Sequence, residues 1–428
     1  MPLRSAFLGG WVQPADVFAQ FYADEPNAFW LDGEFSPSDR FSVLGAGFEI
    51  GAEQSIEAEL AALNVEETAE LRFKWRPGLV GWITYEGQPR FIRAERAIVF
   101  DHDKQGLYFV GDFESEQDFD FWHHAALLRL GLSGGQIATF LHDQIALGAA
   151  SEATLRHDSS SYLDMITRAQ KHIEAGDVYQ ICLTNQITVT TDANPLAVFL
   201  RLRASNPAPY SAFLRIGSTS LVSSSPEQFL QIDSTGQVST KPIKGTRPRG
   251  SDAELDASIA ESLRSDLKER AENLMIVDLM RNDIGKVSAI GSVSVPKLFD
   301  IETYATVHQL VSTVTGQLAD GENAWSAISA AFPGGSMTGA PKIRAMELIR
   351  EFERGPRGIY SGCVGYLTGQ GAAELAMVIR SITFQDGKAT VGVGGGITID
   401  SEPNAELEET KLKARVLLAS LNAADPWA

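Results

Sequence analysis

The ten residues Lys241-Pro-Ile-Lys-Gly-Thr-Arg-Pro-Arg-Gly250 place four cations in one short stretch of a chain whose formal net charge is −19. Two prolines restrict this backbone, and two glycines lack the Cβ that would hold a ligand away. Lys244 stands out because neither of its neighbours is charged. A lysine has a pKa of about 10.4 in water, and it becomes a nucleophile where desolvation or a neighbouring cation lowers that pKa. Arg247 and Arg249 are the candidate cations. A basic surface turn is the competing interpretation.

The composition is that of an ordinary soluble globular protein, with 44% hydrophobic and 21% charged residues. A chain of 428 residues exceeds what one core fills, so we expect two or three substructures. No apolar run reaches the ~20 residues of a membrane span, and the N-terminus lacks a signal-peptide pattern. Two cysteines, Cys182 and Cys363, indicate a reducing compartment, so we expect a cytoplasmic protein. The acidic charge argues against nucleic acid but allows a small anion met by a local cationic pocket or a metal.

Hydrophobic periodicity and turn residues divide the chain. Residues 1 to about 150 alternate short β-like runs with turn residues, which favours an antiparallel sheet. The small and polar residues of 141–158 suggest a linker. The segments beyond it are a helix over 159–175 capped by Ser160, a strand over 178–191, one long helix over 252–281, a helix from Pro341 to about 353, strand-like runs over 360–367, 374–384 and 390–399, and a helix over 404–421.

Three charged residues fall where burial would be costly. Glu227 follows a proline at a strand entrance, where a carboxylate can face a cleft or simply be solvated. Glu272 stands one turn before the apolar half of the predicted long helix, so it needs an ion pair or a metal. Arg380 interrupts an apolar run, and it implies a carboxylate partner from the protein or from a substrate.

The remaining candidate site residues are small residues in two segments and one pair of opposite charges. Gly394, Gly395 and Gly396 interrupt a strand-like run, which usually marks a bulge or the close approach of a ligand. The segment 332–342 precedes a helix whose free N–H groups can meet an anion, although an ordinary helix start has the same appearance. Glu409 and Lys413 are spaced i,i+4, for which a solvated salt bridge is the alternative.

Taken together, these segments resemble the chorismate-utilising enzymes, and within that family the aminodeoxychorismate synthase component I (para-aminobenzoate synthase large subunit) branch. The resemblance spans roughly 155–420 and rests on the motifs at 176–183, 225–227, 242–249, 272–283, 335–342 and 406–414. It implies an α+β fold of two large, mostly antiparallel sheets facing each other, with helices outside and the site between them. It also implies an N-terminal β-rich region over 1–150 and a catalytic region over 155–425.

The resemblance further implies a role for each matching residue. Glu272 and Glu409 would hold one Mg²⁺, which prefers a few carboxylates supplemented by substrate oxygens and waters. Glu227 would act as the general acid/base at the ring hydroxyl. The expected substrate contacts are Arg380, Tyr360, Lys413, Ser336, His308, Gln180, Thr246, Gly394, Gly395 and Gly396.

Two positions separate the branches of the family. Members that add water carry a lysine where this chain has Gln180, and anthranilate synthases carry an alanine where this chain has Lys244. The resemblance therefore implies that Lys244, desolvated and flanked by arginines, attacks the ring, and that ammonia displaces it to give 4-amino-4-deoxychorismate for para-aminobenzoate and folate biosynthesis. The alternatives are an anthranilate synthase component I, which also releases pyruvate, and a non-catalytic chorismate-binding or scaffold protein.

Two further expectations concern partners and regulation. The chain carries no recognisable glutaminase, so we expect a separate glutamine amidotransferase subunit to supply ammonia. Relatives often carry a serine after the acidic residue of an N-terminal element, in a pocket that binds tryptophan. Here Asp32 is followed by Gly33, which puts that pocket in doubt.

Overall fold

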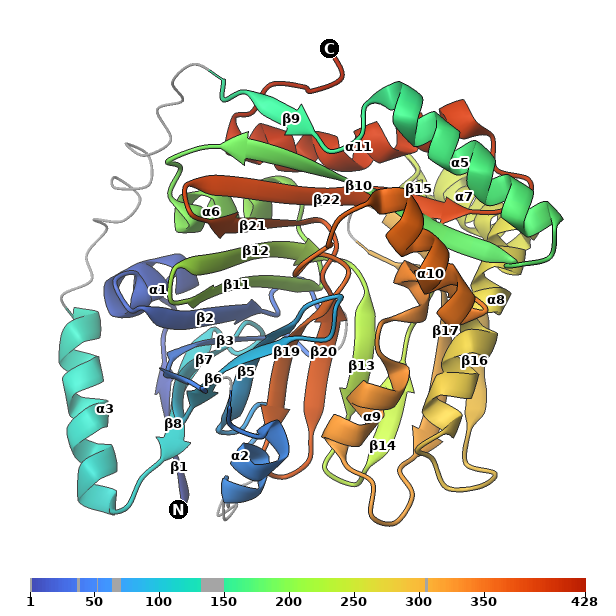
Figure 1. Cartoon of the computed structure of the whole chain (residues 1–428). Coiled ribbons are helices and arrows are strands. Elements are labelled where there is room, and N and C mark those ends of the chain that lie inside the picture. Colours follow the sequence, from blue (N-terminus) through green and yellow to red (C-terminus); the bar gives the residue numbers. More distant parts are fainter. Residues whose placement is uncertain (1, 37–38, 52, 64–70, 132–149, 305–306) are drawn as a thin grey trace.

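The computed structural model describes residues 2–36, 39–51, 53–63, 71–131, 150–304 and 307–428. Two large antiparallel sheets, whose strands run in different directions in Figure 1, dominate this part of the chain. The twelve-stranded sheet has the order β1 (Leu3–Gly9), β8 (Gly106–Asp112), β7 (Arg96–Asp101), β3 (Phe41–Ala46), β2 (Asn27–Asp32), β11 (Tyr210–Ile216), β12 (Thr219–Ser225), β21 (Ser381–Gln385), β22 (Lys388–Ile397), β10 (Gln180–Thr190) and β18 (Gly339–Ala340), with β9 (Ala153–Leu155) paired to β10.

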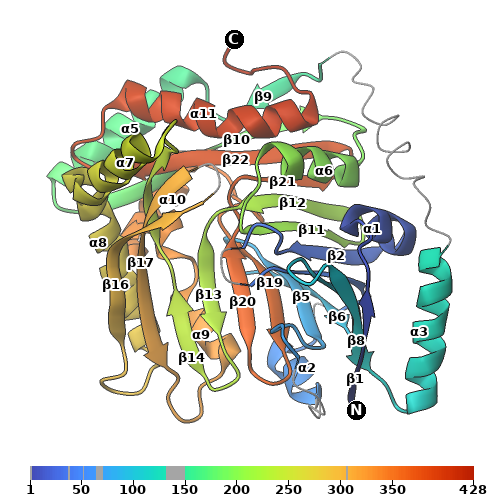
Figure 2. The same cartoon turned by 180° about the vertical axis from the view of Figure 1, so that it is seen from behind.

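The second sheet has ten strands, and one end of it is formed by β16 and β17 with α7 and α8 beside them (Figure 2). Its order is β15 (Ile243–Pro248), β17 (Val307–Gln317), β14 (Gln237–Thr240), β13 (Gln228–Ile232), β20 (Ala373–Met377), β19 (Cys363–Thr368), β5 (Gly78–Ile83), β6 (Pro89–Ala94) and β4 (Phe48–Glu49), with β16 (Ser294–Thr303) paired to β17.

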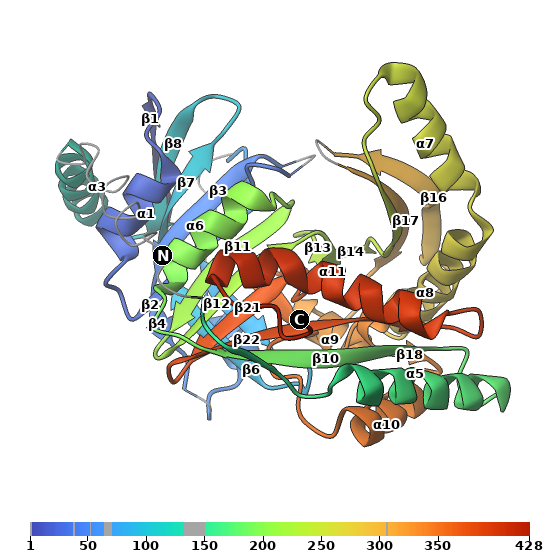
Figure 3. The ribbon, with the colours of Figure 1, turned by 90° about the horizontal axis from the view of Figure 1, so that it is seen from above.

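The helices cover the outer faces of these sheets, and α5 and α11 lie along β10 and β22 (Figure 3). They are α1 (Pro14–Tyr22), α2 (Ile56–Ala62), α3 (Glu116–Gly131), α5 (Ser159–Glu174), α6 (Pro195–Ser205), α7 (Ala253–Ser265), α8 (Leu267–Gly285), α9 (Ala324–Ala331), the 3₁₀ turn η1 (Gly335–Met337), α10 (Lys342–Glu353) and α11 (Pro403–Leu421). None of the helices in the described residues is both long enough and apolar enough for a membrane span. The architecture confirms the predicted α+β class with two antiparallel sheets.

Strands from both halves of the sequence share each sheet. β2 pairs with β11 in the first sheet, and β5 pairs with β19 in the second. One apolar cluster accordingly joins Trp75, Trp82 and Phe29 from the N-terminal third to Leu214 and Val364 from the remainder. This hydrophobic cluster between the sheets therefore depends on both halves.

The predicted long helix over 252–281 is wrong in one respect, because the chain breaks it at Asp266. The Asp266 side chain accepts hydrogen bonds from the N–H groups of Lys268 and Glu269, so it caps the N-terminus of α8. The helical period also predicts one buried stripe of Leu263, Leu267, Leu274 and Val277, and this is only half right: Leu263 and Val277 are buried, whereas Leu267 is 82% exposed and Leu274 is 49% exposed. The first N–H groups of a helix have no acceptor within the helix. The Asp266 carboxylate supplies one, so a new helix can start there although the hydrophobic pattern continues across it.

Three smaller expectations also need correction. The N-cap of α5 is Asp158, whose side chain accepts from Ser161 N–H, rather than Ser160. Of the proposed linker over 141–158, residues 141–149 lie outside the described ones, and Ala153–Leu155 forms a strand. The single run over 374–384 is divided into β20 and β21, which belong to different sheets.

Candidate active site

The candidate site lies where the chain passes twice from one sheet to the other. The first passage joins β12 to β13 and carries Glu227, and the second joins β20 to β21 and carries Arg380. Backbone hydrogen bonds tie the two passages together. Met377 N–H donates to Glu227 O at 3.0 Å, and Ser224 N–H donates to Arg380 O at 3.1 Å. Two residues 153 positions apart in sequence are thereby held on neighbouring backbone segments.

Glu227 is a buried carboxyl group with two polar neighbours, Ser336 and Lys244. Its side chain hydrogen-bonds Ser336 of the turn η1, and Lys244 lies within electrostatic reach. Burial raises the pKa of Glu227 to about 7, against the opposing effects of the Ser336 hydrogen bond and the Lys244 charge. A carboxyl group with that pKa exchanges a proton near neutral pH, as a general acid must.

The pKa of Glu227 predicts a gain in stability for Glu227→Gln in the ligand-free chain. Both folded and unfolded forms are protonated below pH 4.5, so the variant should match the parent there. As the pH rises from 4.5 to about 7, only the unfolded parent ionises, so the parent loses about 3 kcal/mol of unfolding free energy relative to the variant, and above about 7 the loss is complete. Urea unfolding at pH 4 and pH 8 measures this difference. Equal stability of the two proteins at pH 8 would contradict the buried-carboxyl assignment.

Lys244 lies on β15 beside a bulge, because the register with β17 shifts between Lys244 and Thr246. Gly245 takes a φ of 74°, and a Cβ there would lie 2.8 Å from a Leu263 side-chain carbon. The bulge lets Lys244 turn inward, where its side chain is 15% exposed and its Nζ lies 3.7 Å from Glu272 Oε2.

The arginines of the same stretch do not act as expected. Arg247 pairs with Asp266 and Glu269, and Arg249 pairs with Asp256 at 2.7 Å. Both guanidinium groups are therefore engaged by carboxylates of the neighbouring helices, and the charged group beside Lys244 is Glu272 instead. The expectation that these arginines act on Lys244 is not met, because both guanidinium groups are held by the carboxylates of Asp266, Glu269 and Asp256.

The glycines of β22 let four polar side chains approach its backbone. A Cβ on Gly396 would lie 2.5 Å from Gln180 Nε2 and 3.2 Å from Lys244 Nζ. A Cβ on Gly395 would lie 3.3 Å from Glu406 Oε2 and 3.7 Å from Lys413 Nζ. Because consecutive residues of a strand face opposite ways, Gln180 and Lys244 approach β22 on one face, and Glu406 and Lys413 approach it on the other. Glycine at position 396 therefore keeps open a polar cradle that Gln180 and Lys244 face.

Gln180 enters this cradle because of strand alternation. The odd-numbered residues Ile181 and Leu183 pack against α5 and α10, so Gln180 points toward the other face of β10. Gln180 is 1% exposed, and its Oε1 has no hydrogen-bond partner among the described residues. A buried acceptor without a donor is costly, and a bound ligand can supply the donor.

The two glutamates predicted to hold a metal carry the oxygen ligands that a hard divalent cation prefers, but the α11 carboxylate that acts on Glu272 is Glu406 rather than Glu409. Glu272 is half-buried, and its described contacts are ion pairs with Lys244 at 3.7 Å and Lys268 at 3.9 Å, both longer than hydrogen bonds. Glu409 pairs with Lys413 at 2.7 Å, and Lys244 and Lys268 also help to lower its pKa. The described parts of the chain contain no group of three or more His, Cys, Asp or Glu side chains suited to a metal. The donors therefore suit an ion that completes its shell with substrate oxygens and water.

Of the cationic and aromatic candidates, Lys413 and Tyr360 lie against the glycines of β22, and Arg380 is within electrostatic reach of Tyr360 and Glu409. Arg380 takes a φ of 51° between the two sheets, and no ion pair or side-chain hydrogen bond is formed by its guanidinium within the described residues. Burial lowers the pKa of Arg380, and Glu409 and Tyr360 oppose that effect. Lys413 donates to Gly394 O at 2.9 Å, and a Cβ at Gly392 would meet the Tyr360 ring at 2.1 Å. An unpaired, half-buried guanidinium is a receptor for a carboxylate.

The remaining candidates divide into two groups. Thr246 and Arg380 line one cavity of about 140 Å³ with Pro226, and Ser336 reaches Glu227 as described. His308 is 2% exposed and has both ring nitrogens occupied, Nε2 by Asp256 at 2.8 Å and Nδ1 by Thr303 at 2.9 Å. A ligand would have to displace one of these partners to reach the imidazole.

One polar cluster behind the site has no counterpart in the sequence analysis. Arg357 is fully buried and binds Glu353 through Nε and Nη2 at 2.8 and 2.6 Å. Arg357 also donates to Cys182 O and Met337 O, and Glu353 accepts from Thr184 N–H at 2.8 Å. The pair thus fixes β10 near Gln180 and η1 near Ser336. In the sequence, only the i,i+4 spacing of Glu353 and Arg357 indicates this pair, and such spacing usually indicates an ion pair on the surface of a helix.

Breaking this buried pair should be strongly destabilising. Arg357→Met leaves the Glu353 carboxylate buried without its partner, and we expect a loss of about 3–5 kcal/mol in unfolding free energy. Arg281→Met, which removes an exposed pair with Asp278, is the matched control and should cost less than about 1 kcal/mol. Urea unfolding measures both variants. A loss at Arg357 no larger than that at Arg281 would refute the structural role of the pair.

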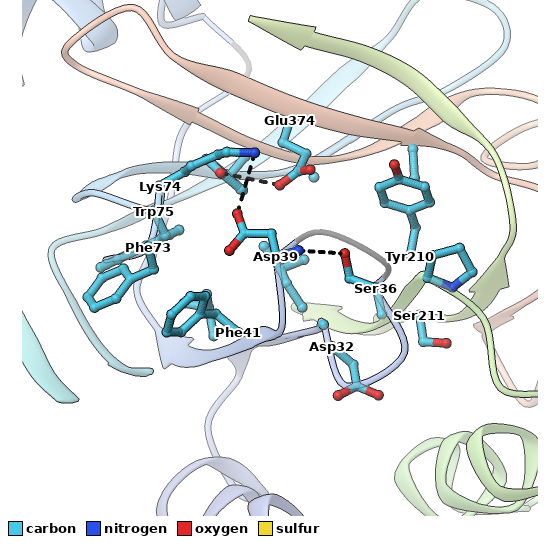
Figure 4. A pocket seen from close by; sticks show the side chains of 18 of the residues that line it. Asp32, Ser36, Asp39, Phe41, Phe73, Lys74, Trp75, Tyr210, Ser211 and Glu374 are labelled. Carbon is cyan, nitrogen blue, oxygen red and sulfur yellow. Dashed lines mark hydrogen bonds and ion pairs between the residues drawn. The ribbon is translucent and has the colours of Figure 1, made fainter. Parts of the chain in front are cut away.

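The pocket beside Asp32 and Gly33, where relatives bind tryptophan, is small, and charged side chains of this chain lie within it (Figure 4). Its cavity of about 80 Å³ equals roughly two or three water molecules at about 30 Å³ each. Lys74 and Asp39 pair at 3.4 Å, and Figure 4 shows Glu374 directed toward them. A Cβ at Gly33 would lie 2.1 Å from Phe41 O. The backbone therefore excludes the serine that relatives carry after the acidic residue.

Comparisons with known proteins agree on one group of relatives. The family described as chorismate binding enzyme matches residues 24–419. An aminodeoxychorismate synthase from Streptomyces griseus is 42% identical over 87% of this chain, which spans 53% of that relative's length. An anthranilate synthase component 1 from Thermus thermophilus is 35% identical over 99% of this chain and 98% of the relative. The crystal structure of anthranilate synthase component I from Streptococcus pneumoniae TIGR4 superposes with a TM-score of 0.78 and 28% identity, over 90% of this chain and 93% of that one.

Proposed function

Because the chain belongs to the chorismate-binding enzymes, we propose that it aminates chorismate with ammonia to give 4-amino-4-deoxychorismate, the precursor of para-aminobenzoate and folate. The observation that carries this proposal is the position of Lys244. Its Nζ faces the Gly396 cradle together with Gln180, and it lies near both Glu227 and Glu272. A primary amine among the acid, the carboxylates and the glycine strand is placed for attack on a ring bound there.

The proposed reaction has two balanced steps. In the first, the Lys244 amine forms a C–N bond to the ring while the ring C–O bond breaks, and Glu227 donates the proton with which the hydroxyl leaves as water. In the second, ammonia forms a C–N bond to the ring and the bond to Lys244 breaks. The enolpyruvyl group stays on the product throughout, so no pyruvate is released.

Gln180 favours ammonia over water as the second nucleophile. A neutral amide cannot remove a proton from water, whereas its free, buried Oε1 can accept a hydrogen bond from an N–H of ammonia. The surrounding cations suit the anionic substrate. Arg380, Lys413 and the amides of Gly394–Gly396 would meet its carboxylates, with Tyr360, Ser336 and Thr246 as further contacts and His308 after displacement of a partner.

We propose that Glu272 and Glu409 hold one Mg²⁺ that also contacts a substrate carboxylate. The ion would neutralise charge on the substrate and fix its position. Removing it with EDTA should lower chorismate turnover by about 100-fold or more, and added Mg²⁺ should restore the rate. Glu272→Gln should raise the Mg²⁺ concentration needed for half-maximal rate. Full activity after exhaustive chelation would reject the metal proposal.

We further propose that ammonia comes from a separate glutamine amidotransferase subunit and that the protein is cytoplasmic. The names of the Thermus and Streptococcus relatives, in which the protein is one component, support a subunit partner. Both cysteines, Cys182 and Cys363, are free and buried, in keeping with a reducing compartment.

The decisive test identifies the product. The purified chain is incubated with chorismate, Mg²⁺ and ammonium at high pH, and the mixture is resolved by liquid chromatography and mass spectrometry. We expect an aminated product that retains its enolpyruvyl group. Anthranilate with pyruvate would establish the second candidate, which is favoured by the Thermus relative matched over 98% of its length. An inert chain, even with an amidotransferase subunit present, would favour the scaffold alternative.

A further inference from the structure

A second cavity lies next to the Glu353–Arg357 pair, outside the site just described. It measures about 720 Å³, within the roughly 300–1,000 Å³ typical of ligand pockets. Its walls come from the turn after β5, from α9, and from α10 with the loop that follows it. Trp325, Ile328, Phe332 and Ile349 make these walls largely apolar and partly aromatic. Such a lining favours a flat hydrophobic ligand.

The charges at this cavity favour an anion. Of its lining carboxylates, Glu353 is neutralised by Arg357, and Glu86 accepts hydrogen bonds from the N–H groups of Arg357 and Gly358. Arg350 and Arg354 are exposed, and neither forms an ion pair or hydrogen bond with the described residues. Two unpaired guanidinium groups at a cavity of a chain with a net charge of −19 are the free receptors there.

The tyrosine that lines the cavity lacks a partner as well. Tyr85 is 9% exposed, and its hydroxyl is buried with no hydrogen-bond partner among the described residues. Its ring stacks on Arg357, whose Cζ lies 4.4 Å from the ring centroid. A buried hydroxyl without a partner destabilises the chain, and an acceptor on a ligand can satisfy it.

We propose that this cavity is a regulatory site for a small aromatic carboxylate or a similar aromatic monoanion. The route to the active site is short. Arg357 lines the cavity and donates hydrogen bonds to Cys182 O and Met337 O, which lie two residues from Gln180 and one residue from Ser336. A ligand that stacks beside Tyr85 and Arg357 therefore acts on the backbone that positions both active-site side chains.

The binding test uses 2-naphthoate as the probe and neutral 2-naphthamide as its matched control. Ligand-observed NMR titration of the full chain should give saturable 2-naphthoate binding with a Kd of about 1 mM or tighter. The amide should bind more weakly. Arg350→Gln with Arg354→Gln should weaken 2-naphthoate by about fivefold or more. Ser329→Trp, which places an indole at the cavity from an exposed position on α9, should abolish binding.

Controls separate this cavity from other sites on the chain. Ser161→Trp, at an exposed serine of α5, should leave binding unchanged. Binding should also persist when chorismate is present at saturation. The absence of saturable binding, binding that survives Ser329→Trp, or displacement by chorismate would each overturn the proposal.

The regulatory part is tested by the rate of chorismate consumption with ammonium and Mg²⁺. Saturating 2-naphthoate should change kcat by at least about twofold in the parent chain and leave Ser329→Trp unaffected. An unchanged parent kcat would refute regulation. Only this kinetic experiment rests on the proposed function, and it holds for either amination product. Failure of the proposed function would appear in the product analysis, whereas failure of the cavity would appear in the titrations.

Discussion

Lys244→Ala should lower kcat/KM for ammonium-dependent amination of chorismate by at least about 100-fold. The substitution removes the amine that faces Gly396 and Gln180, and no other lysine takes its place there in the described residues, because Lys413 is bound to Glu409 and Gly394 O. The measurement is the rate of aminated product by chromatography. Intact-protein mass spectrometry of the acid-quenched parent should also show a fraction of chain carrying the ring adduct.

Two variants control for charge and for chain position. Lys244→Arg keeps the cation beside Glu272 but is not a nucleophile, so it should be nearly as slow as the alanine variant. Lys241→Ala removes the neighbouring lysine, which pairs with Glu302 at 3.0 Å, and should retain at least half of the activity. An alanine variant at position 244 with near-parental kcat/KM would exclude a required adduct while leaving the cation site possible.

Glu227→Gln should reduce kcat by about 10²–10⁴-fold, the usual contribution of a general acid. The amide keeps the shape and can still meet Ser336, but it cannot give a proton to the leaving hydroxyl. The parent should also show a descending limb in kcat above about pH 7, since the acid is active only when protonated and burial raises the pKa of Glu227 to about 7. The variant should lack that limb. Rates are compared from pH 5.5 to 9 at constant free ammonia.

Glu374 supplies a matched carboxyl outside the site. Burial raises the pKa of Glu374 too, but it lies in the N-terminal pocket against Tyr366. Glu374→Gln should keep both the rate and the descending limb. A Glu227→Gln variant that retains more than about a tenth of the parental kcat would remove Glu227 as the acid.

Several site residues could be predicted because their chemistry is local. Glu227 after a proline, Glu272 before an apolar segment and Arg380 within an apolar run are each expensive to bury without a purpose. The structure brings Glu227 and Glu272 near Lys244, and it places Arg380 in a cavity with Thr246, while the roles of all three are proposals. The i,i+4 pair of Glu409 and Lys413 was similarly visible, since helical spacing fixes such neighbours.

Other features could not be predicted, for different physical reasons. The break at Asp266 depends on one capping side chain, which the hydrophobic period does not register. The pairing of Arg247 and Arg249 with α7 and α8 depends on which helices lie beside β15. The occupied imidazole of His308 depends on Asp256, 52 residues earlier in the chain.

The sequence alone determined the α+β class, most strands and helices, and the charged residues that need an explanation, because periodicity and burial cost are properties of short segments. Only the tertiary structure decided how those residues meet. The two passages between the sheets, the cradle at Gly396 and the second cavity each join segments more than a hundred residues apart. The Glu353–Arg357 pair is local, but its contacts with Cys182 and Thr184 span a similar separation. Such contacts are set by sheet order and helix packing, which no local pattern encodes.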